Sequence, residues 1–210
     1  TMAPPVAGEP QRLRQALPAL ADAGMAAGLW LTVLAGGAFG VVDVLTPLRL
    51  NALGSGAVVI SGAFLGAAAL EGVLNPVIGR LSDRRGPLAP VRVALLAAVG
   101  VSVLIPFVAP APVLVALLVI GLPSYGALFV PGSALVSDGA DRRQLHQGLA
   151  FGLANLAWAA GQGAAAASSG ALAQATDNAV PFVVLGTVFA LTVMALRPTG
   201  RRFLARLGVE

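Results

Sequence analysis

Two carboxylic acids lie inside long apolar stretches of the sequence, where an ionisable side chain is costly and usually has a function. Glu71 lies nine residues before Arg80, about 14 Å along a helix, and Asn75 follows it one turn later on the same helix face. A carboxylate beside an amide can bind a cationic group or carry a proton. The alternative is a structural carboxylate tied to a nearby arginine or backbone group. We expect Glu71 and Asn75 to face a cavity.

Asp43 is the second acid, and it lies nearer to the end of its apolar stretch. Only five residues separate it from that end, a depth of about 7 Å, and Pro47 follows one turn later. Asp43 can bind substrate or a proton at this depth. It can equally reach water, or bond Thr46 or Arg49.

Uncharged polar side chains form a third set. Asn155, Trp158 and Gln162 fall within about 60° of one another on a helix, so two amides flank an indole. They can line a binding cavity, or they can hydrogen-bond to adjacent helices. Tyr125 follows Pro123, which removes a backbone hydrogen bond and allows a kink. Its hydroxyl can face a substrate or bond to a neighbouring helix.

Several kinds of chemistry are disfavoured by what the sequence lacks. There is no cysteine, and the one histidine, His146, lies beside Arg142 and Arg143 in a polar segment typical of a solvated loop. We therefore expect no metal site and no cofactor. A hydrolase would need a nucleophile and a base at one depth, but Asp43 and Glu71 differ in depth. No glycine-rich phosphate loop is present. We expect a protein that is not an enzyme.

The elements that hold these residues are predicted to be membrane helices. The 210 residues are 57% hydrophobic and 10% charged, whereas soluble domains average about 25% charged. The apolar runs approach the roughly 20 residues that cross a bilayer. The β-barrel alternative would need strands of about 10 residues with alternating polarity. We predict an all-α integral membrane protein, a bundle of six transmembrane helices, with spans at 24–48, 57–80, 88–108, 112–137, 147–173 and 180–197.

Short polar connections between the predicted spans make neighbouring spans antiparallel, and the arginines then orient the bundle. All 13 basic residues are arginines. Basic residues concentrate on the cytoplasmic side of membrane proteins. With a cytoplasmic N-terminus, only Arg49 lies outside, and the inner side holds Arg12, Arg14, Arg80, Arg84, Arg85, Arg92, Arg142, Arg143, Arg197, Arg201, Arg202 and Arg206.

This arrangement predicts a multi-pass protein of the plasma (cytoplasmic) membrane with both termini cytoplasmic. Residues 1–23 form a cytoplasmic leader, 24–197 the membrane domain and 198–210 a cytoplasmic tail. The arginines lie at helix ends and not on one basic face, so no nucleic-acid partner is expected.

The segment after the second predicted span carries a recognisable motif. It reads Gly79-Arg-Leu-Ser-Asp83-Arg84-Arg-Gly86-Pro87. This resembles the signature Gly-x-x-x-Asp-Arg-x-Gly-Arg of the major facilitator superfamily, which joins the second and third helices of each six-helix half. Gly79, Asp83, Arg84 and Gly86 match, and Pro87 replaces the usual basic residue. The resemblance implies that this segment latches one gated state.

The fifth predicted span carries a fainter resemblance to the antiporter motif of the same superfamily. Gly152 and Gly161 have the expected spacing, but Ala165-Ala166 replaces the central Gly-Pro. The alternative is a helix-packing ridge of small residues. Its members are Gly148, Gly152, Ala159, Gly163, Ala166 and Gly170.

The resemblance covers 24–197 and implies half of a twelve-helix secondary transporter with a midplane substrate site. The incomplete matches to the two motifs and the leader at residues 1–23 favour the C-terminal half of such a transporter. An N-terminal half is the alternative. We expect proton-coupled efflux of drugs or metabolites by alternating access. Expected partners are a small-molecule substrate, protons, the lipid bilayer and a second six-helix half, either a missing half or a second copy. A membrane half-protein that regulates without transporting is also open.

Overall fold

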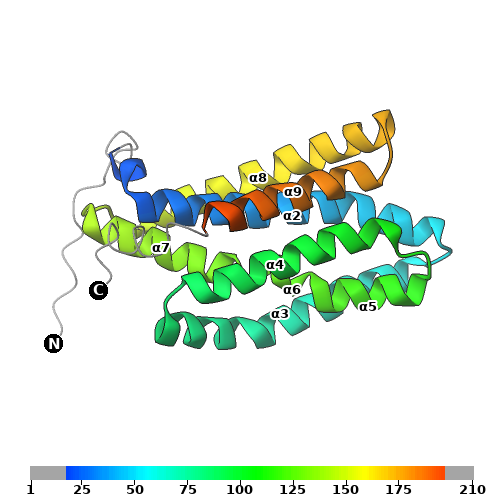
Figure 1. Ribbon diagram of the computed structural model, residues 1–210, viewed down its shortest axis with the longest axis horizontal. Coiled ribbons are helices and arrows are strands. Elements are labelled where there is room, and N and C mark those ends of the chain that lie inside the picture. Colours follow the sequence, from blue (N-terminus) through cyan, green and yellow to red (C-terminus); the bar gives the residue numbers. More distant parts are fainter. Residues whose placement is uncertain (1–17, 197–210) are drawn as a thin grey trace, which may run out of the picture.

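The computed structural model describes residues 18–196, which are helical with no strand. The predicted tail 198–210 and residues 1–17 of the predicted leader lie outside the described residues. Figure 1 shows the helices as an elongated bundle. In chain order they are η1 (Ala19–Ala21), α2 (Ala23–Ala52), α3 (Ala57–Arg85), α4 (Leu88–Leu104), η2 (Ile105–Phe107), α5 (Ala111–Gly121), α6 (Pro123–Gly126), α7 (Phe129–Arg142), α8 (Gln147–Ala175) and α9 (Ala179–Ala195).

These helices follow the six predicted segments, but only four segments are long and apolar enough to cross a membrane. They are α2, α3, α4 with η2, and the succession α5–α7. Helix α8 has 29 residues, but Asn155, Gln162 and a pair of serines dilute its apolar character. Helix α9 is apolar and 17 residues long. Membrane spanning is therefore supported for four helices, and for α8 and α9 it stays a prediction.

The fourth predicted segment is an interrupted rod instead of one continuous helix. Pro123 has no backbone N–H to donate, and the chain tightens there, because Tyr125 N donates to Leu122 O over 2.9 Å. Ser124 Oγ also donates to Gly121 O over 2.6 Å. The break separates α5, α6 and α7 and turns α6 into a short four-residue element in the middle of the bundle.

The α3 helix extends further than predicted, because 57–80 becomes Ala57–Arg85. Asp83 and Arg84 were expected in a connecting loop, and they instead occupy its last turn. Gly86 ends the helix with φ of 77°, a conformation that costs little only for glycine. The chain then reverses into α4.

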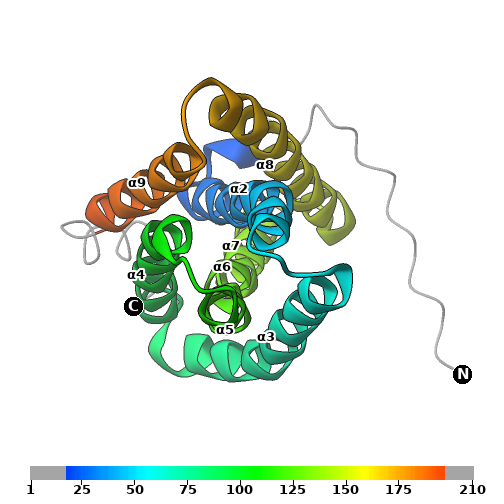
Figure 2. The same ribbon diagram turned by 90° about the vertical axis from the view of Figure 1, so that its right-hand side faces the viewer.

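Helix α2 is the central element, and it packs most extensively on α8 and α7. A Cβ on Gly36 would overlap the Trp158 backbone carbonyl, and one on Gly40 would overlap the Gln162 carbonyl. From the other side, a Cβ on Gly161 would overlap Val33 O. Glycines on both helices thus let the two backbones touch, as in other close-packed membrane helices. Figure 2 shows α8 and α3 on different sides of α2.

The remaining helices pair around this centre, with α3 against α5 and α4 against α9. Chain reversals lie at both ends of the bundle (Figure 1). The end formed by the α3–α4 and α7–α8 reversals carries Arg84, Arg85, Arg142 and Arg143, whereas Arg49 belongs to the opposite end. The described helices thus alternate in direction as predicted.

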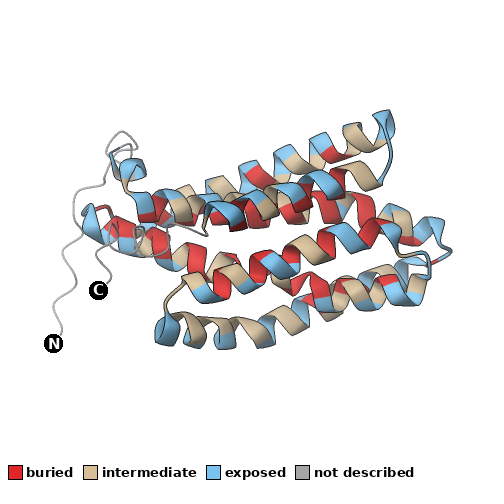
Figure 3. Ribbon diagram, in the orientation of Figure 1, coloured by how far each residue is buried: buried red, intermediate tan, exposed pale blue. Residues whose placement is uncertain are grey.

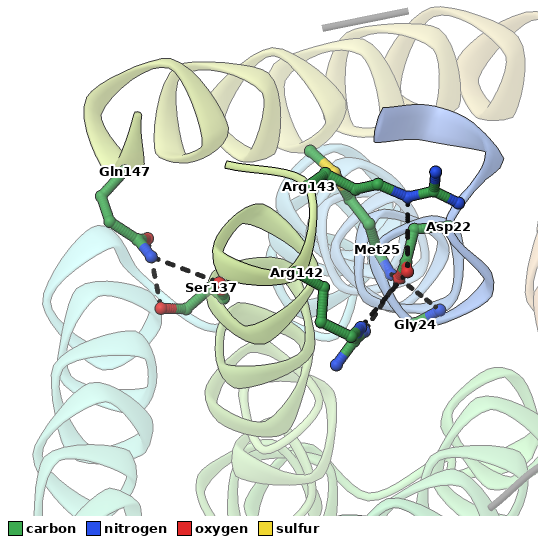
Figure 4. Close-up of polar contacts among 7 residues, drawn as sticks. All are labelled: Asp22, Gly24, Met25, Ser137, Arg142, Arg143 and Gln147. Atoms are coloured by element: carbon green, nitrogen blue, oxygen red, sulfur yellow. Dashed lines mark hydrogen bonds and ion pairs between the residues drawn. The ribbon is translucent and has the colours of Figure 1, made fainter. Parts of the chain in front are cut away.

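Polar contacts close the arginine-rich end (Figure 4). Asp22 caps α2 by accepting from the backbone N–H groups of Gly24 and Met25, each over 3.0 Å. Arg142 Nη2, at the end of α7, donates to the same carboxylate over 2.8 Å. This hydrogen-bonded guanidinium and the two backbone donors hold the pKa of Asp22 below its ordinary value. A second contact joins α7 to α8, where Gln147 Nε2 donates to Asp141 Oδ1 over 2.7 Å.

Burial is uneven across the bundle (Figure 3). In the most apolar window of α2, 61% of the residues are buried, against 11% in α3. Exposed side chains on α3 include Val58, Leu65 and Val73. The hydrophobic core lies instead between α2, α4, α5–α7 and α9.

Candidate functional site

The candidate site is a cavity between α3, α7 and α8. Its volume is about 250 Å³, and it is lined by Glu71, Phe129, Asn155 and Trp158. Three of these residues were singled out from the sequence on two separate helices, and the fold brings them together. Helices α3 and α8 do not pack extensively on each other, so the cavity between them is open.

The Glu71 carboxylate lies deep in this site. It is half-buried, and its hydrogen-bonding neighbour is Asn75, as the one-turn spacing predicted. Asn75 Oδ1 is itself buried without a hydrogen-bond partner. On the far side, the carboxylate packs directly on Gly126 of α6, where a Cβ would overlap it. Among the described residues, no arginine forms an ion pair with Glu71.

A chain of hydrogen bonds joins the cavity to Asp43. Trp158 Nε1 donates to Gln162 Oε1 over 3.1 Å, and Gln162 Nε2 donates to Asp43 Oδ2 over 3.2 Å. The two α8 residues therefore bond to each other and to α2. Neither alternative protein partner of Asp43 binds it, because Arg49 Nη2 donates to Val108 O over 2.8 Å and Thr46 Oγ1 has no partner. Asp43 is exposed, so the alternative in which it reaches water stays open.

Aromatic rings surround the indole of Trp158. The Phe129 ring meets it edge-on, with centroids 5.5 Å apart and an interplanar angle of 89°. The Phe39 ring of α2 lies on another side at 5.5 Å with an angle of 35°. Pairs at these distances are favourable and hold one another in place. The part of the cavity lining formed by Trp158 and Phe129 is therefore aromatic and well supported.

Tyr125 lies in the core and does not line this cavity. Its side chain is fully buried, its hydroxyl is 2.8 Å from Ser102 Oγ of α4, and its ring stacks on Phe189 at 5.6 Å. Of the two readings left open by the sequence, the geometry favours the interhelical hydroxyl. Tyr125 supports the site indirectly, through a T-shaped contact with Phe39 at 6.5 Å.

Five contributors to the site were not singled out from the sequence. Phe129 and Phe39 looked like ordinary apolar residues, and nothing in their spacing distinguishes them. Gly126 is visible only through its contact with Glu71. A signal did exist for the α2–α8 contact, since Gly36 and Gly40 are spaced as in the Gly-x-x-x-Gly pattern of packed membrane helices.

Comparison with protein families identifies the chain. Residues 3–145 match the family model of the Major Facilitator Superfamily, which is more than half of the sequence. The chain belongs to this superfamily. Comparison with curated proteins and with solved structures gives no match. The matched range contains Glu71, Asn75 and Phe129 but ends before α8. As a member of the Major Facilitator Superfamily, the chain is a multi-pass membrane protein that acts in transport of small molecules.

The Major Facilitator Superfamily motif is placed at the arginine-rich end, away from the cavity. Asp83 and Arg84 are exposed in the last turn of α3, and Gly86 supplies the left-handed turn. A Cβ on Gly79 would meet nothing within 4 Å, so no part of the described residues packs closely against this glycine. The latch role of the motif stays a prediction.

The small residues of α8 divide into two sets. Gly161 makes the backbone contact with α2, whereas a Cβ on Gly148, Gly152 or Gly163 would meet nothing within 4 Å. The packing ridge suggested by the sequence is therefore wrong for these three glycines within the described fold. They lie on one open face of α8, close to the face that carries Asn155.

Proposed function

We propose that this chain is one six-helix half of a proton-coupled transporter that exports drugs or metabolites by alternating access. The observation that carries the proposal is the Glu71 carboxylate, which opens into a cavity shared with Asn155 and Trp158. A transporter needs a polar group of this kind at the substrate site between its moving parts. The superfamily match and the membrane-length helices support the same proposal.

Glu71 is the proposed proton-carrying group. Its hydrogen-bond partner is the neutral Asn75, and no arginine of the described residues forms an ion pair with it, so no fixed positive charge holds the carboxylate permanently ionised. A carboxyl at membrane depth without such a partner can exchange its proton as access alternates. Asp43 is the second candidate, connected to the same wall through Gln162.

A second six-helix half would close the open side of the cavity. Helices α3 and α8 flank that side, α3 is the least buried of the long apolar helices, and α8 presents Gly148, Gly152 and Gly163 without neighbours. Small residues on an exposed membrane helix let another backbone approach closely. We propose that this chain is the C-terminal half of the assembly. An N-terminal half and a pair of identical copies are the alternatives.

The test compares the native protein with Glu71→Gln in everted membrane vesicles. A proton gradient is imposed, and the accumulation of a panel of cationic, neutral and anionic compounds is measured. We expect at least one compound to accumulate, to be released by a protonophore and to fail to accumulate with Glu71→Gln. Asp177→Asn, an exposed acid in the α8–α9 turn, is the matched control and should transport normally.

Two outcomes contradict the proposal. If vesicles that contain folded protein accumulate no compound of the panel, the chain belongs to a non-transporting half-protein. If Glu71→Gln accumulates compounds as the native protein does, the proton is carried elsewhere.

A further inference from the structure

We propose that the substrate is an amphipathic organic cation, in which a positively charged nitrogen is attached to an aromatic group, and that Gln162 sets this selectivity by positioning Trp158. The inference rests on the proposed function, because it takes the cavity as the transport site. Three features of the cavity carry it: its charge, its free hydrogen-bonding groups and its aromatic wall.

The charged groups around the cavity are acidic. Glu71 lines it, and Asp43 is joined to it through Gln162. Three arginines of the described residues bind elsewhere: Arg49 to Val108 O, Arg92 to Leu196 O, and Arg142 to Asp22. An anionic substrate would meet a carboxylate at membrane depth without a compensating cation, and the low dielectric makes that repulsion strong. A cationic substrate would instead be attracted by the carboxylate.

The hydrogen-bond acceptors at Glu71 and Asn75 also favour a cationic substrate. Asn75 Oδ1 is a buried acceptor without a partner, and the neighbouring carboxylate is also an acceptor when ionised. A buried acceptor without a donor is costly. A ligand that brings N–H groups or a positive charge can pair with Glu71, which lines the cavity, whereas a carboxylate or phosphate ligand cannot.

The aromatic side chains that line the cavity suit the apolar part of such a ligand. Trp158 and Phe129 line the cavity together, and a cation near an indole face gains a further attraction of about 0.5–2 kcal/mol. An aromatic substituent can stack in the same space. A volume of about 250 Å³ accommodates a single ring with a substituted ammonium group.

Gln162 determines how the indole is presented. Its amide accepts from Trp158 Nε1 and donates to Asp43, so both ends of the amide are used. The polar edge of the indole is thereby held toward Gln162, and the part of the indole that Phe39 and Phe129 leave uncovered lines the cavity. Gln162 is a positioning residue, since it does not itself line the cavity.

The experiment is calorimetric titration of the purified full protein in lipid nanodiscs. The probes are phenyltrimethylammonium, its uncharged isostere tert-butylbenzene, and the anion benzenesulfonate. We expect saturable binding of phenyltrimethylammonium alone. Its Kd should rise at least about tenfold in Glu71→Gln, where the charge is lost, and about tenfold in Trp158→Leu, where the cation–π contact is lost. Trp30→Phe and Asp177→Asn, outside the cavity, should bind as the native protein does.

Gln162→Met tests the positioning role. In a Trp30→Phe background, Trp158 is the single tryptophan, so its fluorescence emission reports the indole alone. We expect Gln162→Met to shift that emission and to reduce the preference for the cation over tert-butylbenzene, with unchanged melting temperature.

Equal binding of benzenesulfonate, or a Kd for the cation that Glu71→Gln leaves unchanged, would overturn the substrate class. Binding that Gln162→Met does not alter, with unshifted emission, would overturn the positioning role. Neither result depends on flux. A protein that binds the cation but transports nothing contradicts the proposed function alone, and one that transports other compounds but does not bind the cation contradicts this inference alone.

Discussion

The carboxylate of Glu71 packs on the Cα of Gly126, and this contact leaves no room for a methyl group. Gly126→Ala should therefore displace the carboxylate from the cavity while the rest of α6 keeps its fold. Because small misplacements of a reacting group have large effects, we expect transport to fall by about 10- to 100-fold. Uptake into everted vesicles measures this.

Gly72→Ala is the control for that substitution. It lies next to Glu71 on α3, and a Cβ there would meet nothing within 4 Å. It should transport at the native rate. Native transport by Gly126→Ala as well would show that the position of Glu71 is not critical.

A substitution at Tyr125 distinguishes a role in stability from a role in contacting the substrate. Tyr125→Phe removes the hydrogen bond to Ser102 and keeps the stacking on Phe189. A buried hydrogen bond contributes about 1 kcal/mol, and Ser102 is left without this partner, so stability should fall by about 1–2 kcal/mol. Substrate affinity should not change. Chemical denaturation and probe titration measure the two quantities.

The Ser102→Ala variant and the double variant complete a cycle for this pair. The two single effects should be strongly non-additive, because both remove one bond. A loss of substrate affinity at unchanged stability would instead place Tyr125 at the substrate.

At the scale of elements, the start of α2 and the end of α7 are held together by Asp22. Asp22→Asn should keep the helix cap and lose the ion pair with Arg142, at a cost of at most about 1 kcal/mol because the Arg142 side chain is 35% exposed. Asp22→Ala should lose about 1 kcal/mol more with the cap. The melting temperatures at pH 7 should fall from the native protein to Asp22→Asn and then to Asp22→Ala.

The pH dependence of the contact between Asp22 and Arg142 follows from the lowered pKa of Asp22, which results mainly from its hydrogen bond with Arg142. A carboxyl with a depressed folded pKa stabilises the fold above its unfolded value of about 3.9, and this contribution is lost as pH falls through the folded pKa. The native protein and Asp22→Asn should differ by a constant amount from pH 7 to about pH 5, and the difference should shrink on further acidification and vanish only below the lowered pKa of folded Asp22. A difference that grows on acidification would contradict this.

At the scale of the whole molecule, the membrane topology can be tested cleanly because the chain has no cysteine. Single cysteines at Ala109 and Asp177 should react with a membrane-impermeant maleimide from outside the cell, and one at Arg85 only after the membrane is opened. Ala109 and Asp177 follow η2 and α8, and Arg85 is the last residue of α3. Labelling of Asp177→Cys from outside would establish that α8 crosses the membrane despite its polar residues.

Inside-only labelling at Asp177 would contradict the six-span arrangement. The exposed site Asn51→Cys, in the last turn of α2, serves as the positive control for outside labelling.

Much of this architecture was readable from the sequence. Runs of apolar residues and short connections gave the helix positions, because membrane helices satisfy their backbone groups internally and need little else to be defined. The contact between Glu71 and Asn75 agrees with their one-turn spacing on a helix, and the membrane depth of Glu71 stays a prediction. The motif from Gly79 to Gly86 indicated the superfamily that the family comparison then showed.

The tertiary structure decided which of these residues meet. The sequence specifies how deep a residue lies on its helix, but neighbours depend on how far two helices rotate and approach, and that is set by packing across the bundle. The contact of Gly36 and Gly40 with the α8 backbone brings Gln162 to Asp43, and the break at Pro123 brings Gly126 to Glu71. The same packing takes Tyr125, at a similar depth, away from the cavity and into the core.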